Sequence, residues 1–512
     1  ALEVYSVTAN SGPTTGGNQV TIRGKGFLRQ VTQHEEVVDI VGATSTSRGY
    51  FGNSLTPDSV VALTSFGKVY AWGNNRYGNV GTGTDCIELL SAAELATESH
   101  CYYSEPQDIT GQFDGTVTKI YQFNIGGDSI NAAVTDRGKA YVWGGMAGLF
   151  NGEFDSDNSY RPADYTAPTP IKDLDGYKVK GLLQLDHDSY AIGGFTDQSI
   201  LIQLPEQSRT DDNRWININL SNQLGAQTIK DIDPYNGLIL TNNGQLLVIA
   251  IPTEPDSVSA LSVIDINAPD EVELVDLTSK IGDGVSFVSA GYGSLALTIG
   301  NDERLYALDI RHSHPAYSTV VNLSDKMQLP SVDKVVGRTR SGYGVLVHTT
   351  TDRIYEVQLI ESSDIDYNQM KAHDITDDLS DDNIKLFNGH LSMTEHTDFI
   401  DYYSFVTSSQ PDTVYSRAAI LENRADINQL ATTSTAKLPL TTRTVDQPAV
   451  SAITFGDLPA TNFTVVDDQT ILATVPAHAA GTVDVTLRDD EANSIVLSNS
   501  YTYTDNEAAG IG

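Results

Sequence analysis

The sequence predicts an all-β protein in which a seven-bladed β-propeller is inserted into a small β-sandwich. Three observations support this prediction. A hairpin pattern recurs along the middle of the chain at a spacing of about fifty residues, which is typical of a propeller. Short alternating strands lie at both ends of the chain, and neither set alone is large enough to bury a sandwich core. The 42 glycines among 512 residues favour many tight turns.

The composition restricts the partners and the compartment. The chain has 67 acidic and 31 basic residues, which give a net charge of −36, and 40% of its residues are hydrophobic. This charge repels phosphate backbones and therefore argues against nucleic acid as a partner. No apolar stretch is long enough to span a bilayer, so direct membrane insertion is not expected. The charge favours solubility and suits an extracellular or cell-surface protein.

The first residues predict two strands of the sandwich. A short strand begins at Val4, and the sequences Ser-Gly-Pro at 11–13 and Gly-Gly at 16–17 form turns. A second strand follows at 20–22 with alternating apolar and polar residues. Phe27 then follows a glycine-containing bend and is the predicted core anchor.

The other strands of this sandwich are predicted near the opposite end of the chain. Short alternating runs separated by Gly, Pro and Asp occur at 450–456, 460–466, 470–476, 481–487 and 501–503. Because neither end supplies enough strands for a core, we expect both ends to fold together as one domain.

The N-terminal pattern resembles the opening of an IPT/TIG domain. The matching residues are Ser11-Gly-Pro-Thr-Thr-Gly-Gly17 and Gly24-Lys-Gly-Phe27. The resemblance implies an immunoglobulin-like fold of the kind found in bacterial surface proteins. It sets the expected boundaries: residues 1–29 and 447–505 form the IPT/TIG domain, residues 30–446 form the propeller, and residues 506–512 form a linker.

The repeat in the middle of the chain is a hairpin. Its clearest copies run from Val61 to Gly73 and from Ala132 to Gly144, and each ends in Tyr-x-Trp-Gly. Five weaker copies are predicted to follow. Aligned on the second strand of the hairpin, the seven copies are anchored at Tyr70, Tyr141, Leu201, Leu247, Tyr306, Tyr355 and a residue near Tyr415 or Ile420.

The first two copies resemble RCC1 repeats. The resemblance depends on Leu63-Thr-Ser-Phe-Gly-Lys-Val-Tyr-Ala-Trp-Gly73 and on Tyr77-Gly-Asn-Val-Gly81. It implies a seven-bladed propeller that serves as a platform for protein interactions, as in nucleotide-exchange factors and secreted enzyme inhibitors. An exchange-factor role fits poorly with the acidic charge and the surface-type host domain. A closed ring brings its two ends together, which is what insertion into another domain requires.

Cys86 and Cys101 are the two cysteines of the chain, and they lie in one loop-like segment. In an extracellular protein we expect a disulfide between them, which would contribute about 3 kcal/mol in the chain-entropy model. Two free thiols are the alternative. A metal site is not expected, because no His or second Cys pair lies nearby at ligand spacing. The loop is either a contact surface or a merely stabilised connection.

The chain lacks the common catalytic motifs. It contains no His-Glu-x-x-His, no Gly-x-Ser-x-Gly and no P-loop. No cofactor is expected, and calcium is the candidate ion because several acidic turns offer carboxylate oxygens. The candidate ligands are Asp173, Asp175, Asp374, Asp377 and Asp378, and solvated acidic turns are the alternative interpretation.

The sequence therefore favours a non-catalytic bacterial cell-surface or secreted binding protein. In this hypothesis the propeller is an adhesin-like head that binds a protein or glycan, and the IPT/TIG domain is a stalk module. One alternative is a self-assembling structural subunit of a surface layer or filament. Another is a polysaccharide hydrolase with paired carboxylates in the propeller.

Overall fold

The computed structural model describes most of the chain, and strands dominate in it. The described residues are 2–42, 59–85, 102–125, 128–154, 162–185, 192–203, 215–234, 236–250, 272–289, 295–309, 319–338, 344–358, 370–393, 399–421 and 430–505. The linker predicted at 506–512 lies outside them. Within them, no helix has the length and apolar character needed to cross a membrane. The chain divides into two compact units, one of residues 1–35 with 440–512 and one of residues 36–439.

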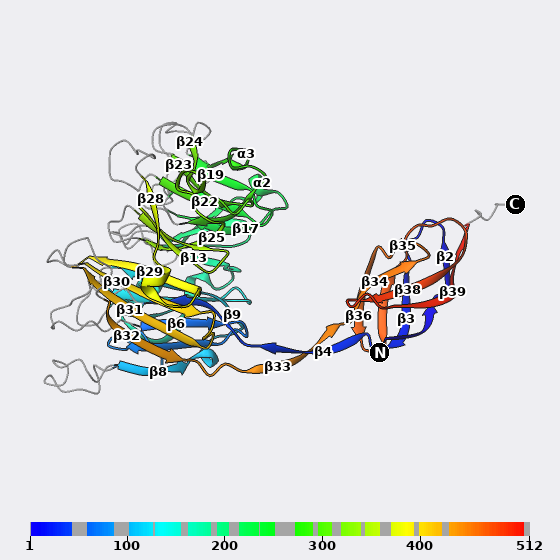
Figure 1. Ribbon diagram of the computed structural model, residues 1–512, viewed down its shortest axis with the longest axis horizontal. Helices are drawn as coiled ribbons and strands as arrows, with labels where there is room; N and C mark the ends of the chain where they lie inside the picture. Colours follow the sequence, from blue (N-terminus) through cyan, green and yellow to red (C-terminus); the bar gives the residue numbers. More distant parts are fainter. Residues whose placement is uncertain are drawn as a thin grey trace. The chain divides into compact units, whose positions relative to one another are not determined.

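The first unit contains a β-sandwich to which both ends of the chain contribute (Figure 1). Its strands are β1 (Glu3–Thr8), β2 (Ser11–Pro13), β3 (Gln19–Lys25), β34 (Val450–Phe455), β35 (Leu458–Pro459), β36 (Asn462–Asp467), β37 (Thr470–Thr474), β38 (Gly481–Asp489) and β39 (Ser494–Thr504). One sheet has the order β1-β3-β37-β36 and the other β2-β39-β38-β34-β35. Both sheets therefore combine strands from the two ends.

The core of the sandwich explains why the ends fold together. Ile22 on β3 lies opposite Ile471 on β37, and both side chains are fully buried. Phe27, the predicted anchor, is also fully buried and packs in the same cluster as Phe455 and Tyr501. The prediction of one immunoglobulin-like sandwich made from both ends is confirmed.

A two-stranded ribbon continues from this sandwich. β4 (Leu28–His34) pairs antiparallel with β33 (Thr442–Pro448), with Leu28 opposite Pro448 and His34 opposite Thr442. The predicted domain boundaries cut through this ribbon, at 29/30 and 446/447. The contacts of the chain divide instead at 35/36 and 439/440, because the two ribbon strands pair with each other and not with a blade.

A buried glutamate closes the end of the ribbon. The Glu35 side chain is 4% exposed. Its Oε2 atom accepts hydrogen bonds from the Thr441 backbone N–H at 2.9 Å and from the Thr441 hydroxyl at 2.8 Å. The Glu35 N–H in turn donates to the Thr441 carbonyl at 2.9 Å. These bonds hold the two crossing segments together where the inserted propeller begins and ends.

Within the described residues, the second unit contains seven blades of four antiparallel strands each, and a parallel bridge between the first strands of blades 6 and 7 joins these two blades into one eight-stranded sheet. Blade 1 is β5 (Val37–Val41), β6 (Ser59–Thr64), β7 (Val69–Asn74) and β8 (Tyr102–Asp108); blade 2 is β9 (Val117–Ile125), β10 (Asp128–Thr135), β11 (Ala140–Gly144) and β12 (Tyr165–Pro170); blade 3 is β13 (Gly181–Gln184), β14 (Ile192–Phe195), β15 (Ser199–Gln203) and β16 (Trp215–Asn219); blade 4 is β17 (Ile229–Asp233), β18 (Leu238–Thr241), β19 (Leu246–Ala250) and β20 (Glu273–Asp276); blade 5 is β21 (Val285–Ser289), β22 (Leu295–Gly300), β23 (Leu305–Asp309) and β24 (Thr319–Asn322); blade 6 is β25 (Val332–Arg338), β26 (Gly344–Thr349), β27 (Ile354–Gln358) and β28 (Lys371–Asp374); blade 7 is β29 (Ile384–Met393), β30 (Phe399–Thr407), β31 (Thr413–Leu421) and β32 (Leu430–Lys437).

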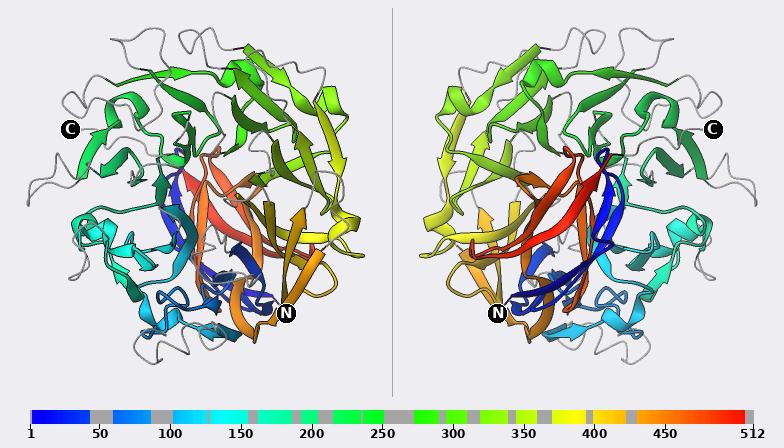
Figure 2. Two further views of the ribbon diagram at one scale, coloured as in Figure 1. Left: turned by 90° about the vertical axis from the view of Figure 1, so that its left-hand side faces the viewer. Right: turned by 90° about the vertical axis from the view of Figure 1, so that its right-hand side faces the viewer.

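The blades follow one another around a ring in chain order (Figure 2). At six of the seven joints between blades, the first strands of the two neighbouring blades contact each other, so these strands form the inner part of the ring. Each blade is one continuous segment, and no strand is exchanged between the first and last blades. Closure depends instead on contacts of β29 and β30 with β5, supported by an ion pair between Lys385 Nζ and Glu36 Oε2 at 3.1 Å.

The predicted repeat anchors all lie on the third strand of a blade. Tyr415 belongs to β31, which settles the seventh copy as a blade of its own. In most blades the anchor residue pairs with the last residue of the fourth strand. In blades 3 and 7 the residue at that place is Ser199 or Thr413, so the predicted anchors Leu201 and Tyr415 lie two residues too far along the third strand. A shift of two keeps a side chain on the same face of a strand, so the apolar pattern did not reveal it.

Candidate binding surface

The two faces of the propeller differ in the connections that leave them. Because the strands of a blade alternate in direction, the second-to-third turns and the links to the next blade leave one face, which we call the turn face. The other connections leave the opposite face, which we call the loop face. Turns inside the blades on the turn face are short, such as 65–68 and 350–353. Connections on the loop face include 42–58, 75–101 and 251–272.

A recurring turn of the type Asp/Asn-Leu/Ile-Thr/Ser ends the fourth strand of several blades on the turn face. Its copies are Asp108-Ile109-Thr110, Asn219-Leu220-Ser221, Asp276-Leu277-Thr278, Asn322-Leu323-Ser324 and Asp374-Ile375-Thr376. The Asp or Asn side chain of all copies but Asn322 accepts a hydrogen bond from the backbone N–H two residues later. This geometry is an Asx turn. The middle residue is buried in each copy.

The hydroxyl group of this turn binds the third strand of its blade. The hydroxyls of Thr110, Thr278, Ser324 and Thr376 accept hydrogen bonds from the backbone N–H groups of Val69, Leu246, Leu305 and Ile354, at 2.8 to 2.9 Å. A short helical segment then leads to the next blade. These segments are η1 (Thr110–Gln112), η3 (Lys172–Leu174), α2 (Ser221–Leu224), α3 (Thr278–Ile281), α4 (Leu323–Met327) and α5 (Thr376–Leu379).

Replacing the fully buried Thr376 with valine tests this turn. Valine keeps the shape but removes the acceptor of the Ile354 N–H, so we expect a loss of about 1–3 kcal/mol in the free energy of unfolding. Serine keeps the hydroxyl, and Thr376→Ser should therefore cost less than Thr376→Val. Urea denaturation measures both. Equal losses in the two variants would show that the hydroxyl does not stabilise the blade.

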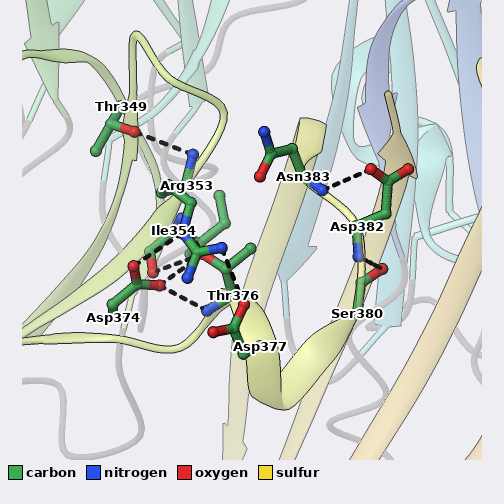
Figure 3. A network of polar contacts seen from close by, with 9 residues as sticks. All are labelled: Thr349, Arg353, Ile354, Asp374, Thr376, Asp377, Ser380, Asp382 and Asn383. Atoms are coloured by element: carbon green, nitrogen blue, oxygen red, sulfur yellow. Dashed lines mark hydrogen bonds and ion pairs between the residues drawn. The ribbon is translucent and has the colours of Figure 1, made fainter. Parts of the chain in front are cut away.

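Two of the candidate calcium ligands lie beside an arginine (Figure 3). Arg353 Nε is 2.9 Å from Asp374 Oδ2, and Arg353 Nη1 is 2.9 Å from Asp377 Oδ1. Burial alone would raise the pKa of Asp374, but hydrogen bonds from Thr376 and the ion pair with Arg353 outweigh it and hold that pKa below its usual range. The guanidinium of Arg353 thus supplies the positive charge that calcium was expected to supply.

The other acidic candidates are not gathered into a site. Asp173 and Asp175 are exposed at and after η3, and Asp378 has His373 as a neighbour at 4.0 Å. Within the described ranges, no group of three or more His, Cys, Asp or Glu side chains is arranged to hold a metal ion. Calcium binding stays a prediction. Cys86 and Cys101 lie outside the described residues, so their disulfide also stays a prediction.

On the loop face, the segment that follows β7 is closely held. Asn75 joins its two ends, because Oδ1 accepts from the Val80 N–H at 2.9 Å and Nδ2 donates to the Thr84 carbonyl at 2.7 Å. Gly78 has a φ of 75°, and a Cβ there would lie 2.4 Å from the Thr166 Cα. Glycine is therefore required both by the backbone conformation and by the close packing on blade 2.

This segment carries an arginine and a tyrosine next to each other. The Arg76 guanidinium lies 5.2 Å from the centroid of the Tyr77 ring, within the range of a cation–π contact. Both side chains are half-buried, and the Arg76 N–H donates to Asn74 Oδ1 at 2.9 Å. Arg and Tyr are among the residues that contribute most to protein interfaces. The loop face thus contains a fixed Arg–Tyr pair.

A buried polar network around Asn79 holds this segment against blade 2. The Asn79 carbonyl accepts from Trp143 Nε1 at 3.0 Å and from Asn131 Nδ2 at 2.8 Å. Asn79 Nδ2 donates to the Ser129 carbonyl at 2.9 Å. All these residues are buried. The network joins the blade 1 segment that carries Arg76 and Tyr77 to two strands of blade 2.

The inner strands hold charged residues that bear on the hydrolase hypothesis. Burial raises the pKa of Asp39 more than the charges of Lys334 and Lys119 lower it. Lys119 also lies 3.5 Å from Asp231. The Asp39 carboxyl group thus has a raised pKa, and the charged groups that shift it are lysines. A glycosidase needs a second carboxyl group as partner, and the hydrolase stays a prediction.

Two family profiles match the chain. The one described as "Regulator of chromosome condensation (RCC1) repeat" matches residues 67–129, and the one described as "IPT/TIG domain" matches residues 446–504. This chain carries an RCC1 repeat and an IPT/TIG domain. The matched RCC1 repeat begins at the hairpin turn of blade 1 and ends in β10, so it spans the joint between two blades. The IPT/TIG match covers the C-terminal strands, and β1 to β3 complete that domain.

Several solved structures have a similar chain path. Prp20p from Saccharomyces cerevisiae is 15% identical, with 71% of this chain and 91% of that chain covered and a TM-score of 0.40. AofleA from Arthrobotrys oligospora is 8% identical, with 86% and 99% covered and a TM-score of 0.36. Human WBSCR16 is 14% identical, with 75% and 84% covered and a TM-score of 0.31. These likenesses are too weak to support a conclusion about function. A comparison with curated proteins gives no match.

Proposed function

We propose that this protein is an adhesin-like binding protein of the cell surface. In this proposal the loop face of the propeller binds a protein partner, and the IPT/TIG domain is a stalk module. An RCC1-type propeller combined with an IPT/TIG domain fits a protein-binding module. The net charge of −36 supports an extracellular setting and argues against nucleic acid as the partner.

The difference between the two faces carries the proposal. The turn face consists largely of short turns whose polar groups bond within the blades, as in the Thr376 turn. The loop face sends out the long connections and holds the Arg76–Tyr77 pair on a rigid base. Binding residues commonly lie on loops that a rigid scaffold positions. A preordered Arg–Tyr pair loses little conformational freedom when a partner binds.

A binding experiment with the whole chain tests this proposal. Labelled protein is applied to an array of purified extracellular proteins and to an array of glycans, and the Kd of each hit is measured. We expect protein hits. In Arg76→Ala/Tyr77→Ala their affinity should fall by about tenfold or more, which is the size expected for truncated interface anchors.

The turn face offers a matched control. Arg137 and Tyr177 are an exposed Arg and Tyr on that face, so Arg137→Ala/Tyr177→Ala should leave the affinity unchanged. Loss of binding in the control alone would place the partner on the turn face and overturn the proposal. Hits restricted to glycans would also contradict a protein partner. Urea denaturation of each variant checks that the fold is retained.

The cell-surface location has its own test. Intact cells that produce the protein are treated with a protease, and the peptides released are identified by mass spectrometry. We expect peptides from the propeller among them. Recovery only after cell lysis would contradict a surface location. The structural-subunit alternative predicts concentration-dependent polymers in light scattering.

A further inference from the structure

A buried histidine joins two blades of the ring. His348 on β26 is 4% exposed. Its Nδ1 lies 2.7 Å from Asp333 Oδ1 on β25, and its Nε2 lies 2.9 Å from the Ile384 carbonyl oxygen on β29. β25 and β26 belong to blade 6, whereas β29 is the first strand of blade 7. One imidazole ring therefore connects three strands across the boundary between these blades, which we call the 6–7 seam.

The chemistry of the two partners fixes the protonation of this ring. A carbonyl oxygen only accepts hydrogen bonds, and so does an ionised carboxylate. Each ring nitrogen must therefore carry a proton to bond its partner. A neutral imidazole has only one N–H and leaves one of the two short contacts without a proton. The geometry thus favours the imidazolium form.

The groups that surround the ring favour its positive charge. Asp333 faces it from β25, and Asp352 Oδ1 from the turn after β26 lies 3.6 Å from Nε2. On the blade 7 side, the Ile384 carbonyl accepts from the ring, and the Ser408 hydroxyl donates to Asp352 at 3.3 Å. Lys385, the neighbouring cation on β29, is paired with Glu36 at 3.1 Å.

We propose that His348 is a protonated latch between blades 6 and 7, and that it makes the 6–7 seam dependent on pH. While the ring is protonated, it bonds both blades. Loss of the Nε2 proton breaks the bond to Ile384 in blade 7, whereas loss of the Nδ1 proton breaks the bond to Asp333 that orients the ring within blade 6. The seam also contains a hydrogen bond from the Ile384 N–H to the Asp352 carbonyl, at 2.9 Å, and this amide reports on opening of the seam.

The direction of the pH dependence follows from the folded-state pKa. Burial alone would lower the pKa of His348, but the hydrogen bond and charge of Asp333, the Ile384 carbonyl and the charge of Asp352 outweigh it and raise that pKa above 6.5. A raised pKa means that the folded state binds the proton more tightly than the unfolded state does. The latch therefore stabilises the seam fully below pH 6.5, and its contribution is lost as the pH rises through the folded-state pKa.

Two measurements on the full-length protein test the proposal. In the first, ¹⁵N-histidine labelling and NMR follow the ring nitrogens of His348 with pH, assigned by their absence in His348→Gln. We expect both nitrogens to be protonated at pH 6.5. In the second, hydrogen exchange at the Ile384 amide is compared between the wild type and His348→Gln at each pH. At low pH the amide should exchange faster in His348→Gln than in the wild type. The ratio of the variant's rate to the wild-type rate should fall as the pH rises from 6.5 through the folded-state pKa, by about tenfold in total for each unit by which that pKa exceeds 6.5.

His373 provides the matched control, because it is exposed and lies in the same blade. His373→Gln should leave the exchange of the Ile384 amide as it is in the wild type at every pH. A His348 ring that is neutral at pH 6.5 in the wild-type protein would overturn the proposal. The proposal is also overturned if a folded His348→Gln variant keeps the pH dependence of the wild type.

Discussion

Replacing Trp143 with alanine is expected to lower the free energy of unfolding by about 3–5 kcal/mol, which is typical for a large buried aromatic residue. Trp143 is fully buried in the core between blades 1 and 2, and its ring contacts Phe113 edge-on at a centroid distance of 5.8 Å. Alanine removes the ring and also the hydrogen bond from Nε1 to the Asn79 carbonyl. Urea denaturation, followed by hydrogen exchange in blades 1 and 2, measures the loss and its location.

Phenylalanine at the same position separates packing from hydrogen bonding. Trp143→Phe retains most of the apolar contact, and the Asn79 carbonyl keeps its second donor, Asn131, at 2.8 Å. We therefore expect a loss well below that of Trp143→Ala. If the phenylalanine variant were as unstable as the alanine variant, the hydrogen bond and not the packing would dominate. An alanine variant as stable as the wild type would contradict the assigned role of Trp143.

The same residues explain why the repeat was easy to recognise in two blades and hard to recognise in the others. The joint between blades 1 and 2 depends on Trp143 and on the Asn75 and Asn79 side chains, whose chemistry allows few replacements. The joint between blades 3 and 4 is filled by aliphatic residues such as Ile200 and Ile239. Aliphatic residues replace one another at a small cost in stability. The apolar pattern of the repeat therefore remains in these blades, whereas the residue types that identify an RCC1 repeat are lost.

The sequence predicted the sandwich and the seven hairpins because both follow from local alternation and turn residues. It did not predict the partner of Asp374 and Asp377. The two carboxylates pair with Arg353, which lies on a different strand connection of the same blade, and nothing in the local sequence indicates that pairing. The sequence also did not predict the β4–β33 ribbon. The two strands of the ribbon are far apart in the chain, and no local sequence pattern indicates the register in which such distant strands pair.

Replacing Gly337 with alanine is expected to open the 6–7 seam, at a cost of about 3 kcal/mol or more, the upper range for overpacking. Gly337 on β25 faces Gly389 on β29 in a parallel bridge. A Cβ at Gly337 would lie 2.2 Å from the Gly389 oxygen and 2.8 Å from its carbonyl carbon. Both are backbone atoms, so the clash can be relieved only if the two blades separate. Hydrogen exchange of β25 and β29, together with urea denaturation, measures the effect.

Gly389→Ala is the matched control for this prediction. Its added Cβ would meet the ends of side chains, at 2.7 Å from Leu346 Cδ1 and 2.8 Å from Phe387 Cε1. Those ends can shift, so Gly389→Ala should cost less stability than Gly337→Ala, and equal costs would contradict the backbone clash.

Gly337→Ala and His348→Gln both weaken the 6–7 seam, but their effects should differ in pH dependence. Gly337→Ala should raise exchange at the Ile384 amide at every pH, because a steric clash does not titrate. His348→Gln should instead change how that exchange depends on pH, because it removes the group that does titrate.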